Sequence, residues 1–396
     1  MLTTDYTSKI LDLQDVQVEK VENLEGKQKI YIKLGRKVVN CPCCNAETSK
    51  IHDYRTQAIK DCVAFGKQIE LILRKRRYVC PTCGKRFAEP NSFVPKYHRM
   101  TSRLVDQVVE KLSDEHSFTS VARETGLSVS TVIRIFDHIQ YPTMKVCPEV
   151  LSIDEFKGNT GGEKYNAILC DVKNRRVLDI LPQRQENYLI DYFKKTDRSP
   201  VSHFVSDMWT TYREVSNNFF AGATFLVDKY HWIRQTIWAF EAIRKEEQKH
   251  LRADVRKHFK HSRSLLLKRY DSLTPEERQS VDKMLWYSDK LREAHSIKEW
   301  FFNVLDTENI SDRKKKFKSW IDSVSETELI PFKKCAQTYS RWQTGILNSF
   351  DTPFTNGFTE GCNNKIKVLK RNAYGYRRFD RFRNRILHMF SHQNVV

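Results

Sequence analysis

The chain has 396 residues, 40% of them hydrophobic and 12% aromatic, which excludes wholesale disorder and leaves room for two or three domains. The formal net charge of +19 favours a polyanionic partner, above all nucleic acid, over a small metabolite. No apolar run approaches the roughly 20 residues needed to cross a bilayer, and no charged-then-apolar leader follows Met1. We therefore expect a cytoplasmic protein with no membrane partner.

The N-terminal region predicts a β-hairpin followed by a zinc site. Residues 16–39 alternate between apolar and polar side chains on either side of LEGKQ. Two Cys-x-x-Cys pairs follow at predicted strand ends, Cys41 with Cys44 and Cys80 with Cys83. Four thiolates on two such knuckles are typical of a zinc ribbon with a structural Zn²⁺ ion. Cys43 lies inside the first knuckle and remains an alternative ligand.

The sequence SFTSVARETGLSVSTVIRIFDHI, which begins at Ser117, has helical periodicity and predicts a helix-turn-helix. Gly126 permits the positive φ that the turn between the helices requires, and Ser128 is a suitable cap for the second helix. This second helix, at residues 128–137, is the predicted recognition helix. The polar residues on its exposed side, which we expect to contact DNA, are Ser130, Thr131 and Arg134.

From residue 149 the pattern becomes rich in strands. Three apolar runs (LSIDEF, KYNAILCDV and RVLDILP) are followed by alternating helical and strand-like segments. This order predicts the mixed sheet of a ribonuclease-H-like core. After Trp232 the pattern is helical for more than a hundred residues, which predicts an all-helical insertion in that core. Thr274 with Glu277 and Ser325 with Glu328 are predicted capping boxes within it.

Three carboxylates are candidates for a catalytic site. Asp154 lies inside the first predicted strand of this core, where an acid is costly unless it binds something, and Asp207 closes the fourth. These two strands are adjacent in a ribonuclease-H-like sheet, so their carboxylates should converge. Glu360, which begins a later helix, would complete a site for two Mg²⁺ or Mn²⁺ ions that catalyse displacement at phosphorus.

Each acid taken singly also has a structural explanation, as a turn cap or as a partner of a helix dipole. Strand alternation should turn Glu155 away from Asp154. Asp171 and Asp179 are further competing acids and rank second.

The residues after Glu360 are strongly basic. Between Gly361 and Arg385 there are nine Lys or Arg residues and one acid, Asp380. Bound cations would invert the local field of Glu360, so a carboxylate at the head of a DNA-binding segment is not a misfit. The residues expected to hold phosphates are Lys365, Lys367, Lys370, Arg371 and Arg377.

In combination and order, these motifs resemble the DDE transposases of bacterial insertion sequences, specifically the ISL-three family. The resemblance covers nearly the whole chain, through CPCC, CPTCGKRF, SVARETGLSVSTV, SIDEF, VSDMWTTY, LVDKYHW and TNGFTEGCNNKIKVLKRNAYGYRRF. It implies Asp154, Asp207 and Glu360 as the catalytic triad, a helical insertion before the glutamate, and a D-x-x-H element at Asp228 and His231.

Asp228 also ends a predicted strand and competes with Asp207 for the place of the second catalytic acid. Asp207 is preferred because the fourth strand abuts the first. Asp228 and His231 are expected to support the site or to contact DNA, although a purely structural hydrogen-bonded pair is the alternative.

The resemblance implies a nucleoid-associated transposase that binds terminal inverted repeats, cleaves double-stranded DNA and joins the freed 3′-hydroxyl to target DNA, as a homodimer or larger assembly. The alternatives are a catalytically inactive DNA-binding regulator and a structure-specific nuclease of the same fold. We expect a multidomain α/β chain with a hairpin and zinc ribbon at 1–98, a helix-turn-helix domain at 99–147, the first part of the catalytic core at 148–232, the helical insertion at 233–353, and the C-terminal helical part of the core at 354–396.

Overall fold

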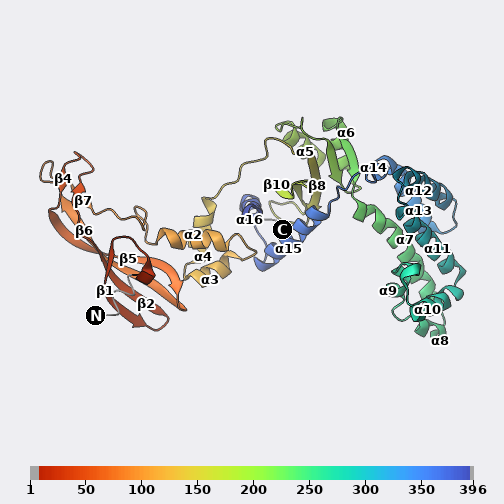
Figure 1. Cartoon of the computed structure of the whole chain (residues 1–396), viewed down its shortest axis with the longest axis horizontal. Coiled ribbons are helices and arrows are strands. Elements are labelled where there is room, and N and C mark those ends of the chain that lie inside the picture. Colours follow the sequence, from red (N-terminus) through yellow and green to blue (C-terminus); the bar gives the residue numbers. More distant parts are fainter. Residues whose placement is uncertain (1–8, 393–396) are drawn as a thin grey trace. The chain divides into compact units, whose positions relative to one another are not determined.

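The computed structural model describes residues 9–392, and its contacts divide the chain into two units (Figure 1). Within the described residues, one unit contains 9–141 together with Val368–Tyr376 and 380–392. The other contains Pro142–Lys367 and Arg377–Phe379. Across residues 9–392, every helix is too short or too polar to span a lipid bilayer.

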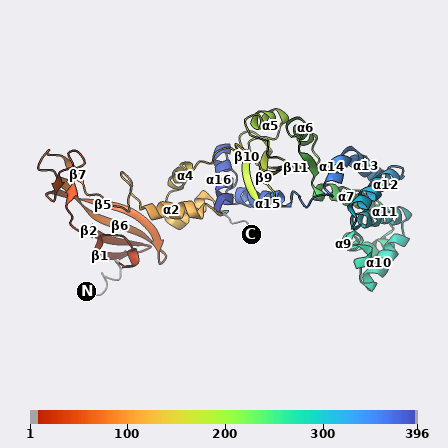
Figure 2. The same cartoon turned by 45° about the horizontal axis from the view of Figure 1, so that its top comes forward.

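The first unit begins with a twisted five-stranded sheet in the order β1-β2-β6-β5, with β7 beside β6 (Figure 2). The predicted hairpin is confirmed, because β1 and β2 pair antiparallel. The sequence did not predict β5, which carries polar side chains at most positions and pairs with β6 along almost its whole length. The strands are β1 (Val16–Leu24), β2 (Lys27–Leu34), β5 (Ile51–Ala64), β6 (Lys67–Val79) and β7 (Arg86–Ala88), with a separate pair of β3 (Val39–Asn40) and β4 (Glu47–Thr48).

Three helices follow, α2 (Ser102–Lys111), α3 (Phe118–Thr125) and α4 (Val129–Asp137). The predicted helix-turn-helix is confirmed: Gly126 ends α3 with φ of 65°, and the Ser128 side chain accepts a hydrogen bond from the backbone N–H of Thr131. A left-handed φ is least costly for glycine, which explains that residue at the turn.

The C-terminal helix α16 (Phe379–His392) packs against this helix-turn-helix. The guanidinium of Arg385 is buried and donates hydrogen bonds to the backbone carbonyls of Leu112, Asp114 and His116, at the end of α2. The ring of His388 lies edge-on to that of Phe136 on α4, with centroids 5.5 Å apart. The C-terminal helix α16 therefore packs with α2 and α4, although it lies far from them in the chain.

The second unit contains a mixed sheet in the order β10-β9-β8-β11-β12. The strands β8, β9 and β10 are antiparallel neighbours, whereas β11 runs parallel to both β8 and β12. The predicted strands are all present, as β8 (Val150–Phe156), β9 (Asn166–Asp171), β10 (Arg176–Leu181), β11 (His203–Ser206) and β12 (Thr224–Val227), with α5 (Glu186–Phe193) and α6 (Thr210–Phe219) between them.

The two faces of this sheet are covered differently. Leu151 and Ile153 of β8 pack with α5 and α6 in one apolar core. The alternate residue Ser152 faces the other side, where its hydroxyl lies 2.7 Å from that of Thr359 on α15 (Gly357–Asn372). Figures 1 and 2 show α5 and α6 on one side of the sheet and the start of α15 on the other. Strand alternation therefore places Asp154 on the α15 side.

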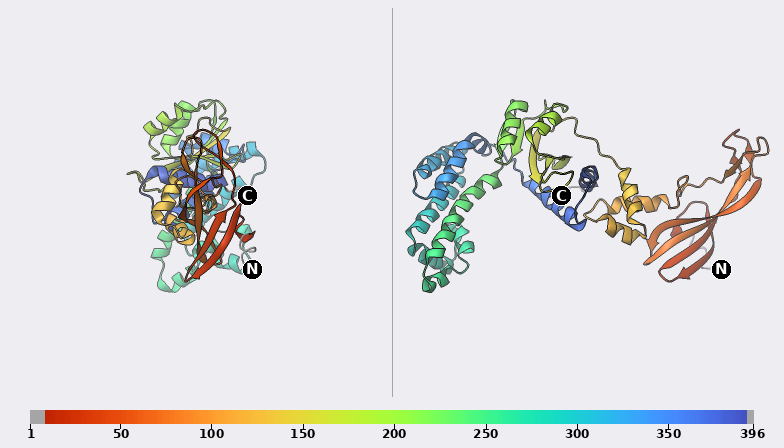
Figure 3. Two further views of the ribbon diagram at one scale, coloured as in Figure 1. Left: turned by 90° about the vertical axis from the view of Figure 1, so that its left-hand side faces the viewer. Right: turned by 180° about the vertical axis from the view of Figure 1, so that it is seen from behind.

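A group of helices stands between β12 and α15 in the chain and has an apolar core of its own, which includes Trp232, Phe301 and Trp320. Figure 3 shows these green-to-blue helices gathered alongside one another. The capping box of Thr274 and Glu277 is confirmed, but that of Ser325 and Glu328 is wrong, because Ser325 ends one helix and the next begins at Ile330. The helices are α7 (Lys229–His250), α8 (Ala253–Arg256), α9 (Ser262–Leu267), α10 (Pro275–Trp286), α11 (Asp289–Leu305), α12 (Ile310–Ser325), α13 (Ile330–Arg341) and α14 (Gln343–Asn348), with short 3-10 turns at Lys257–Phe259 and Tyr270–Ser272.

Candidate functional site

The four predicted zinc ligands lie together in the first unit. The Sγ atoms of Cys41 and Cys83 are 3.6 Å apart, and those of Cys44 and Cys80 are 3.5 Å apart. All four sulfur atoms lie within 4.8 Å of one another. Tetrahedral Zn²⁺ with Zn–S bonds of about 2.3 Å needs sulfur atoms about 3.8 Å apart, so the cluster fits the ion. Cys43 is exposed and is not part of this four-sulfur group.

The two knuckles have the same backbone geometry. The N–H of Asn45 donates to the carbonyl of Cys41, and the N–H of Gly84 donates to that of Cys80; both donor residues, Asn45 and Gly84, have a left-handed φ. Backbone N–H groups of Cys83 and Thr82 lower the pKa of the Cys80 thiol to about 6. A thiolate is the form that binds zinc, so the turn itself prepares this ligand.

In the second unit, the sheet brings Asp154 and Asp207 together. Asp154 is near the end of β8, and Asp207 directly follows β11, which pairs with β8. One carboxylate oxygen from each lies within 4.8 Å of the other and of an oxygen of Glu155. Glu155 is held from the opposite face of the sheet by Arg184 at 2.5 Å and the Tyr212 hydroxyl at 3.1 Å. Its carboxylate thus has its partners on the opposite face, but the predicted separation from Asp154 is incomplete, because an oxygen of each lies within 4.8 Å of the other at the sheet edge.

Burial and mutual repulsion perturb these acids. Burial raises the pKa of Asp154 to about 8, and the charges of Asp207, Glu155 and Glu360 add to the rise. Burial and the charge of Glu155 raise the pKa of Asp207 to about 7. Carboxyl groups whose negative form is this unfavourable are suited to a cation that would compensate the charge.

Glu360 lies in a second group with Asp228 and His231, whose ligand atoms are also within 4.8 Å of one another. Its Oε1 is 3.6 Å from Nε2 of His231. Burial raises the pKa of Glu360, and the charge of Asp228 adds to this effect. The three predicted catalytic acids are therefore divided between two groups, which are close enough for the charge of Glu360 to raise the pKa of Asp154.

Asp228 connects these groups to the backbone. Its Oδ1 accepts a hydrogen bond of 2.7 Å from the backbone N–H of Asn356, just before α15 begins. Its Oδ2 is buried and has no hydrogen-bond partner among residues 9–392, and the same is true of Oδ1 of Asp207. Buried carboxylate oxygens are costly when unpartnered, so both atoms fit a role as ligands of a divalent cation, which prefers oxygen donors.

Sequence reasoning missed Asn363. Its Nδ2 donates to Oδ2 of Asp154 at 2.9 Å, and the side chain is buried. Asn363 follows Glu360 by three residues on α15, so both side chains lie on one face of the helix. The spacing Glu-x-x-Asn was the available signal, but the sequence did not show which strand this face would meet.

The competing acids Asp171 and Asp179 do not join either group. Asp171 accepts hydrogen bonds from the backbone and side chain of Asn174, which closes the turn after β9. Asp179 is buried and accepts from the Tyr192 hydroxyl at 2.6 Å. Both therefore have local structural partners.

The residues expected to contact DNA are mostly at the surface. On α4, Ser130 and Arg134 are exposed, while the Thr131 hydroxyl is half-buried and lies 2.8 Å from that of Ser128. On α15 and the turn after it, Lys370 is half-buried and the exposed residues are Lys365, Lys367, Arg371 and Arg377.

Comparisons with known proteins agree with this arrangement. A family model described as a transposase, of family ISL3, matches residues 151–386, which is more than half of the chain. A model of the helix-turn-helix domain of transposase family ISL3 matches residues 89–140, and one of the zinc finger of transposases IS204/IS1001/IS1096/IS1165 matches residues 37–83.

Two curated proteins are similar in sequence. The transposase for insertion sequence element IS1001 of Bordetella parapertussis is 26% identical over 381 residues, which cover 92% of each chain. A protein named as an ATP-dependent protease, from Lactococcus lactis subsp. lactis, is 30% identical over 122 residues, which cover 30% of this chain and 36% of that protein.

Proposed function

We propose, from the premise that the chain belongs to the ISL3 family of transposases, that it cleaves and joins DNA at a divalent-metal site formed by Asp154, Asp207 and Glu360. A transposase of this family is a DNA-binding, DNA-processing enzyme, with a helix-turn-helix and a zinc ribbon in front of the catalytic region.

The catalytic region is proposed to be a ribonuclease-H-like core. Its support is the sheet order β10-β9-β8-β11-β12, with the first three strands antiparallel and β11 parallel to β8. In this reading, the helices from α7 to α14 are an insertion between β12 and α15. The predicted domain boundaries, with the catalytic core at 148–232 and 354–396, remain part of the proposal.

The observation that carries the proposal is that acids from three distant segments lie in two neighbouring groups, Asp154 and Asp207 in one and Glu360 in the other. Asp154, Asp207 and Glu360 come from β8, the end of β11 and α15, and two of them have strongly raised pKa values. Three such carboxylates would hold two Mg²⁺ or Mn²⁺ ions. When bound, such ions activate the attacking oxygen and stabilise the leaving oxygen in a displacement at phosphorus.

The surrounding side chains orient these acids. Asn363 fixes one oxygen of Asp154, and the backbone N–H of Glu155 donates to the other at 2.8 Å. Asp228 fixes the start of α15, which sets the position of Glu360. His231 contacts Glu360 directly and is placed to orient its carboxylate or to contact DNA.

DNA recognition is divided between two segments in this proposal. Ser130, Thr131 and Arg134 on α4 would read base edges of the terminal inverted repeats in the major groove. The basic residues of α15 and its following turn would hold phosphates of the terminal and target DNA. Each chain would hold one structural Zn²⁺ on Cys41, Cys44, Cys80 and Cys83, and the active assembly would be a homodimer or larger on DNA.

The decisive experiment is strand cleavage and joining by the full-length protein on duplexes that carry the element's ends, with Mg²⁺. Asp154→Asn, Asp207→Asn and Glu360→Gln should each reduce the rate by more than the roughly 100-fold expected for loss of an outer partner, with little change in end binding. Asp228→Asn is the matched comparison and should retain measurable joining.

Full activity of Asp207→Asn together with an inactive Asp228→Asn would assign the second acid to Asp228. End binding without cleavage by the wild-type protein would favour the inactive regulator. Cleavage of branched DNA without preference for the element's ends would favour a structure-specific nuclease.

A further inference from the structure

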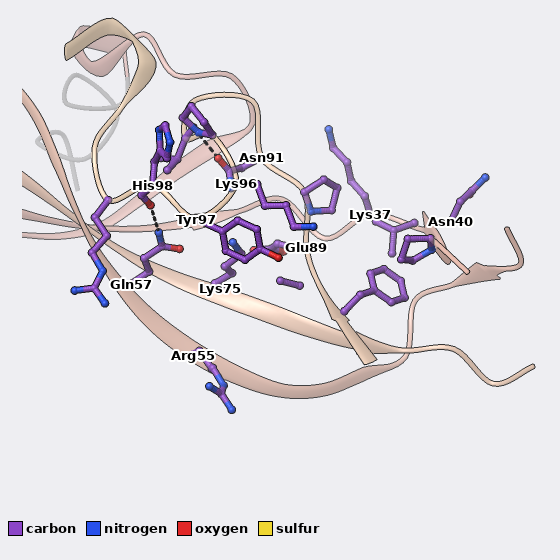
Figure 4. A pocket seen from close by; sticks show the side chains of 18 of the residues that line it. Lys37, Asn40, Arg55, Gln57, Lys75, Glu89, Asn91, Lys96, Tyr97 and His98 are labelled. Atoms are coloured by element: carbon purple, nitrogen blue, oxygen red, sulfur yellow. Dashed lines mark hydrogen bonds between the residues drawn. The ribbon is translucent and has the colours of Figure 1, made fainter. Parts of the chain in front are cut away.

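A large groove lies in the first unit. It has a volume of about 1240 Å³ and lies between the paired strands β5 and β6, the first zinc knuckle and the segment from Glu89 to Arg99 (Figure 4). The side chains that give it its chemistry are Arg55, Gln57, Lys75, Lys96, Tyr97 and Arg99.

The lining is cationic. Among its residues, Glu89 is the one acid, and it is buried in an ion pair of 3.0 Å with Arg76. Lys37 also lines the groove and pairs with exposed Asp15. The remaining cations face the groove without a neutralising acid in its lining, so its ligand should be an anion.

The cations on the strands interrupt an apolar face. Ile59, Leu71 and Leu73 are buried in the core of this sheet. Further along the strands, Arg55 of β5 and Lys75 of β6 lie on the same face as these residues, because side chains alternate between the faces. The two cations are directly opposite each other in the register of the strands. Like charges in such a cross-strand pair destabilise a sheet. Folding alone does not explain this pair, whereas binding of an anion does.

Tyr97 adds an aromatic surface to the same groove. Its side chain is 89% exposed, and its φ of 68° is unfavourable for a residue other than glycine. Such backbone conformations cluster at binding sites when neighbouring contacts hold them. Here Gln57 donates to the carbonyl of His98 at 3.0 Å, and the backbone N–H of Lys60 donates to that of Arg99 at 2.9 Å. The ring is therefore presented by a fixed segment.

The groove continues to the helix-turn-helix. A second cavity, of about 680 Å³, shares Tyr97, His98 and Arg99 with the groove and is also lined by Arg134 and His138, at the end of α4. Both cavities lie within the first unit. A polyanion in the groove would thus reach the recognition helix past Arg99 and Arg134, the two cations that line the second cavity.

We propose that this groove binds the sugar-phosphate backbone of duplex DNA beside the bases read by α4, with Arg55, Lys75, Lys96 and Arg99 on phosphates and Tyr97 against the sugars. The inference rests on the proposed function and adds to it a second, separate contact with the terminal DNA. Phosphate contacts position a duplex without reading its sequence, so the groove would set register and orientation.

The test uses the full-length protein and compares Arg55→Ala/Lys75→Ala with a control, Lys20→Ala/Lys33→Ala, which removes two cations from β1 and β2 outside the groove. Affinity for an end duplex and for a random duplex is measured over a salt series, with hydroxyl-radical footprinting of the end duplex. In the groove variant, the slope of log affinity against log salt should become shallower by up to about 1.8. Its affinity for both duplexes should fall about 10-fold. Its footprint should lose a stretch next to that of α4, and the control should match wild type.

Zinc content reports whether the variant folds, and Arg55→Gln/Lys75→Gln replaces it if zinc is lost. If the groove variant keeps the wild-type slope and footprint while Arg134→Ala weakens end discrimination, DNA binding by the groove is wrong. The proposed function would remain intact. Retained strand joining in Asp154→Asn and Glu360→Gln would instead overturn the proposed function, whatever the groove variant does.

Discussion

Asn363 donates a hydrogen bond from Nδ2 to Oδ2 of Asp154 at 2.9 Å, although the two residues are 209 positions apart in the chain. This bond links α15, which carries Glu360, to β8, the central strand of the sheet in the second unit. The bond orients the carboxylate of Asp154, and Asn363 lies on the same face of α15 as Glu360. The relative position of Asp154 and Glu360 therefore depends on Asn363.

We expect Asn363→Ala to lower the rate of strand cleavage by about 10- to 100-fold, the usual effect of losing a partner that orients a metal ligand. End binding should stay unchanged, and the Mg²⁺ concentration for half-maximal rate should rise. Asn364→Ala is the matched control, because Asn364 is exposed and contacts Lys367 instead. An unchanged Mg²⁺ requirement in Asn363→Ala would show that the bond serves folding alone.

The zinc cluster gives a prediction that separates neighbouring cysteines. Cys41→Ser should lose the bound zinc and unfold the N-terminal region, because metal binding contributes much of the stability of a small ribbon. Cys43→Ser, two residues away and exposed, should keep one zinc per chain. Elemental analysis and circular dichroism of both variants test this. If Cys41→Ser keeps one zinc ion per chain and Cys43→Ser loses it, Cys43 is the ligand in place of Cys41.

The two basic segments should contribute differently to DNA binding. Arg134→Ala should reduce discrimination between the terminal repeat and random DNA, because α4 faces base edges in the proposed complex. Lys367→Ala/Lys370→Ala should weaken binding to all DNA alike and lower the salt slope by up to about 0.9 for each lost contact. Affinities for both DNAs over a salt series distinguish these effects. The opposite outcome, with sequence preference lost only in the lysine variant, would exchange the two roles.

Local pattern was sufficient to predict much of the fold. Apolar alternation predicted the strands from β8 to β12, and Gly126 and Ser128 predicted the ends of α3 and α4, because each signal depends on a few adjacent residues. The strand β5 was not predicted, since it extends past the core and keeps polar residues on both faces.

Contacts between distant segments could not be predicted from the sequence. The hydrogen bonds of Arg385 to the end of α2, and of Asn363 to Asp154, depend on how far each helix reaches across another element. The grouping of Glu360 with Asp228 is likewise a long-range feature, because Asp228 follows β12 and accepts a hydrogen bond from the backbone N–H of Asn356, just before α15. The sequence predicted that Asp154 and Asp207 would converge, but it contained no sign that Glu360 would lie with Asp228 and His231 instead.

The raised pKa values of the acids predict how pH and Mg²⁺ together control stability. Burial raises the pKa of Asp154 to about 8 and that of Asp207 to about 7, whereas an Asp in an unfolded chain titrates near pH 3.9, on the order of four units lower for Asp154. Between about pH 4 and about pH 8 the folded chain thus holds more protons than the unfolded chain. In Mg²⁺-free buffer the free energy of unfolding should therefore fall as pH rises through this window. Mg²⁺ bound at the proposed site would take the place of the protons, so its stabilising effect should increase over the same range.

We expect the Mg²⁺-induced rise in Tm to be larger at about pH 8 than at about pH 6 in the wild-type protein. Asp154→Asn should remove most of this rise, because the amide cannot replace a charged ligand. Without Mg²⁺ at about pH 8, the same variant should be more stable than wild type by about 1 kcal/mol or more, since it no longer buries a repelled carboxylate. Asp179→Asn is the matched control, as Asp179 is buried but outside both groups of acids, and it should keep the Mg²⁺ effect. Thermal unfolding at both pH values, with and without Mg²⁺, tests this. If the rise in Tm is equal at the two pH values, or if it persists in Asp154→Asn, the Asp154 carboxyl does not hold the ion.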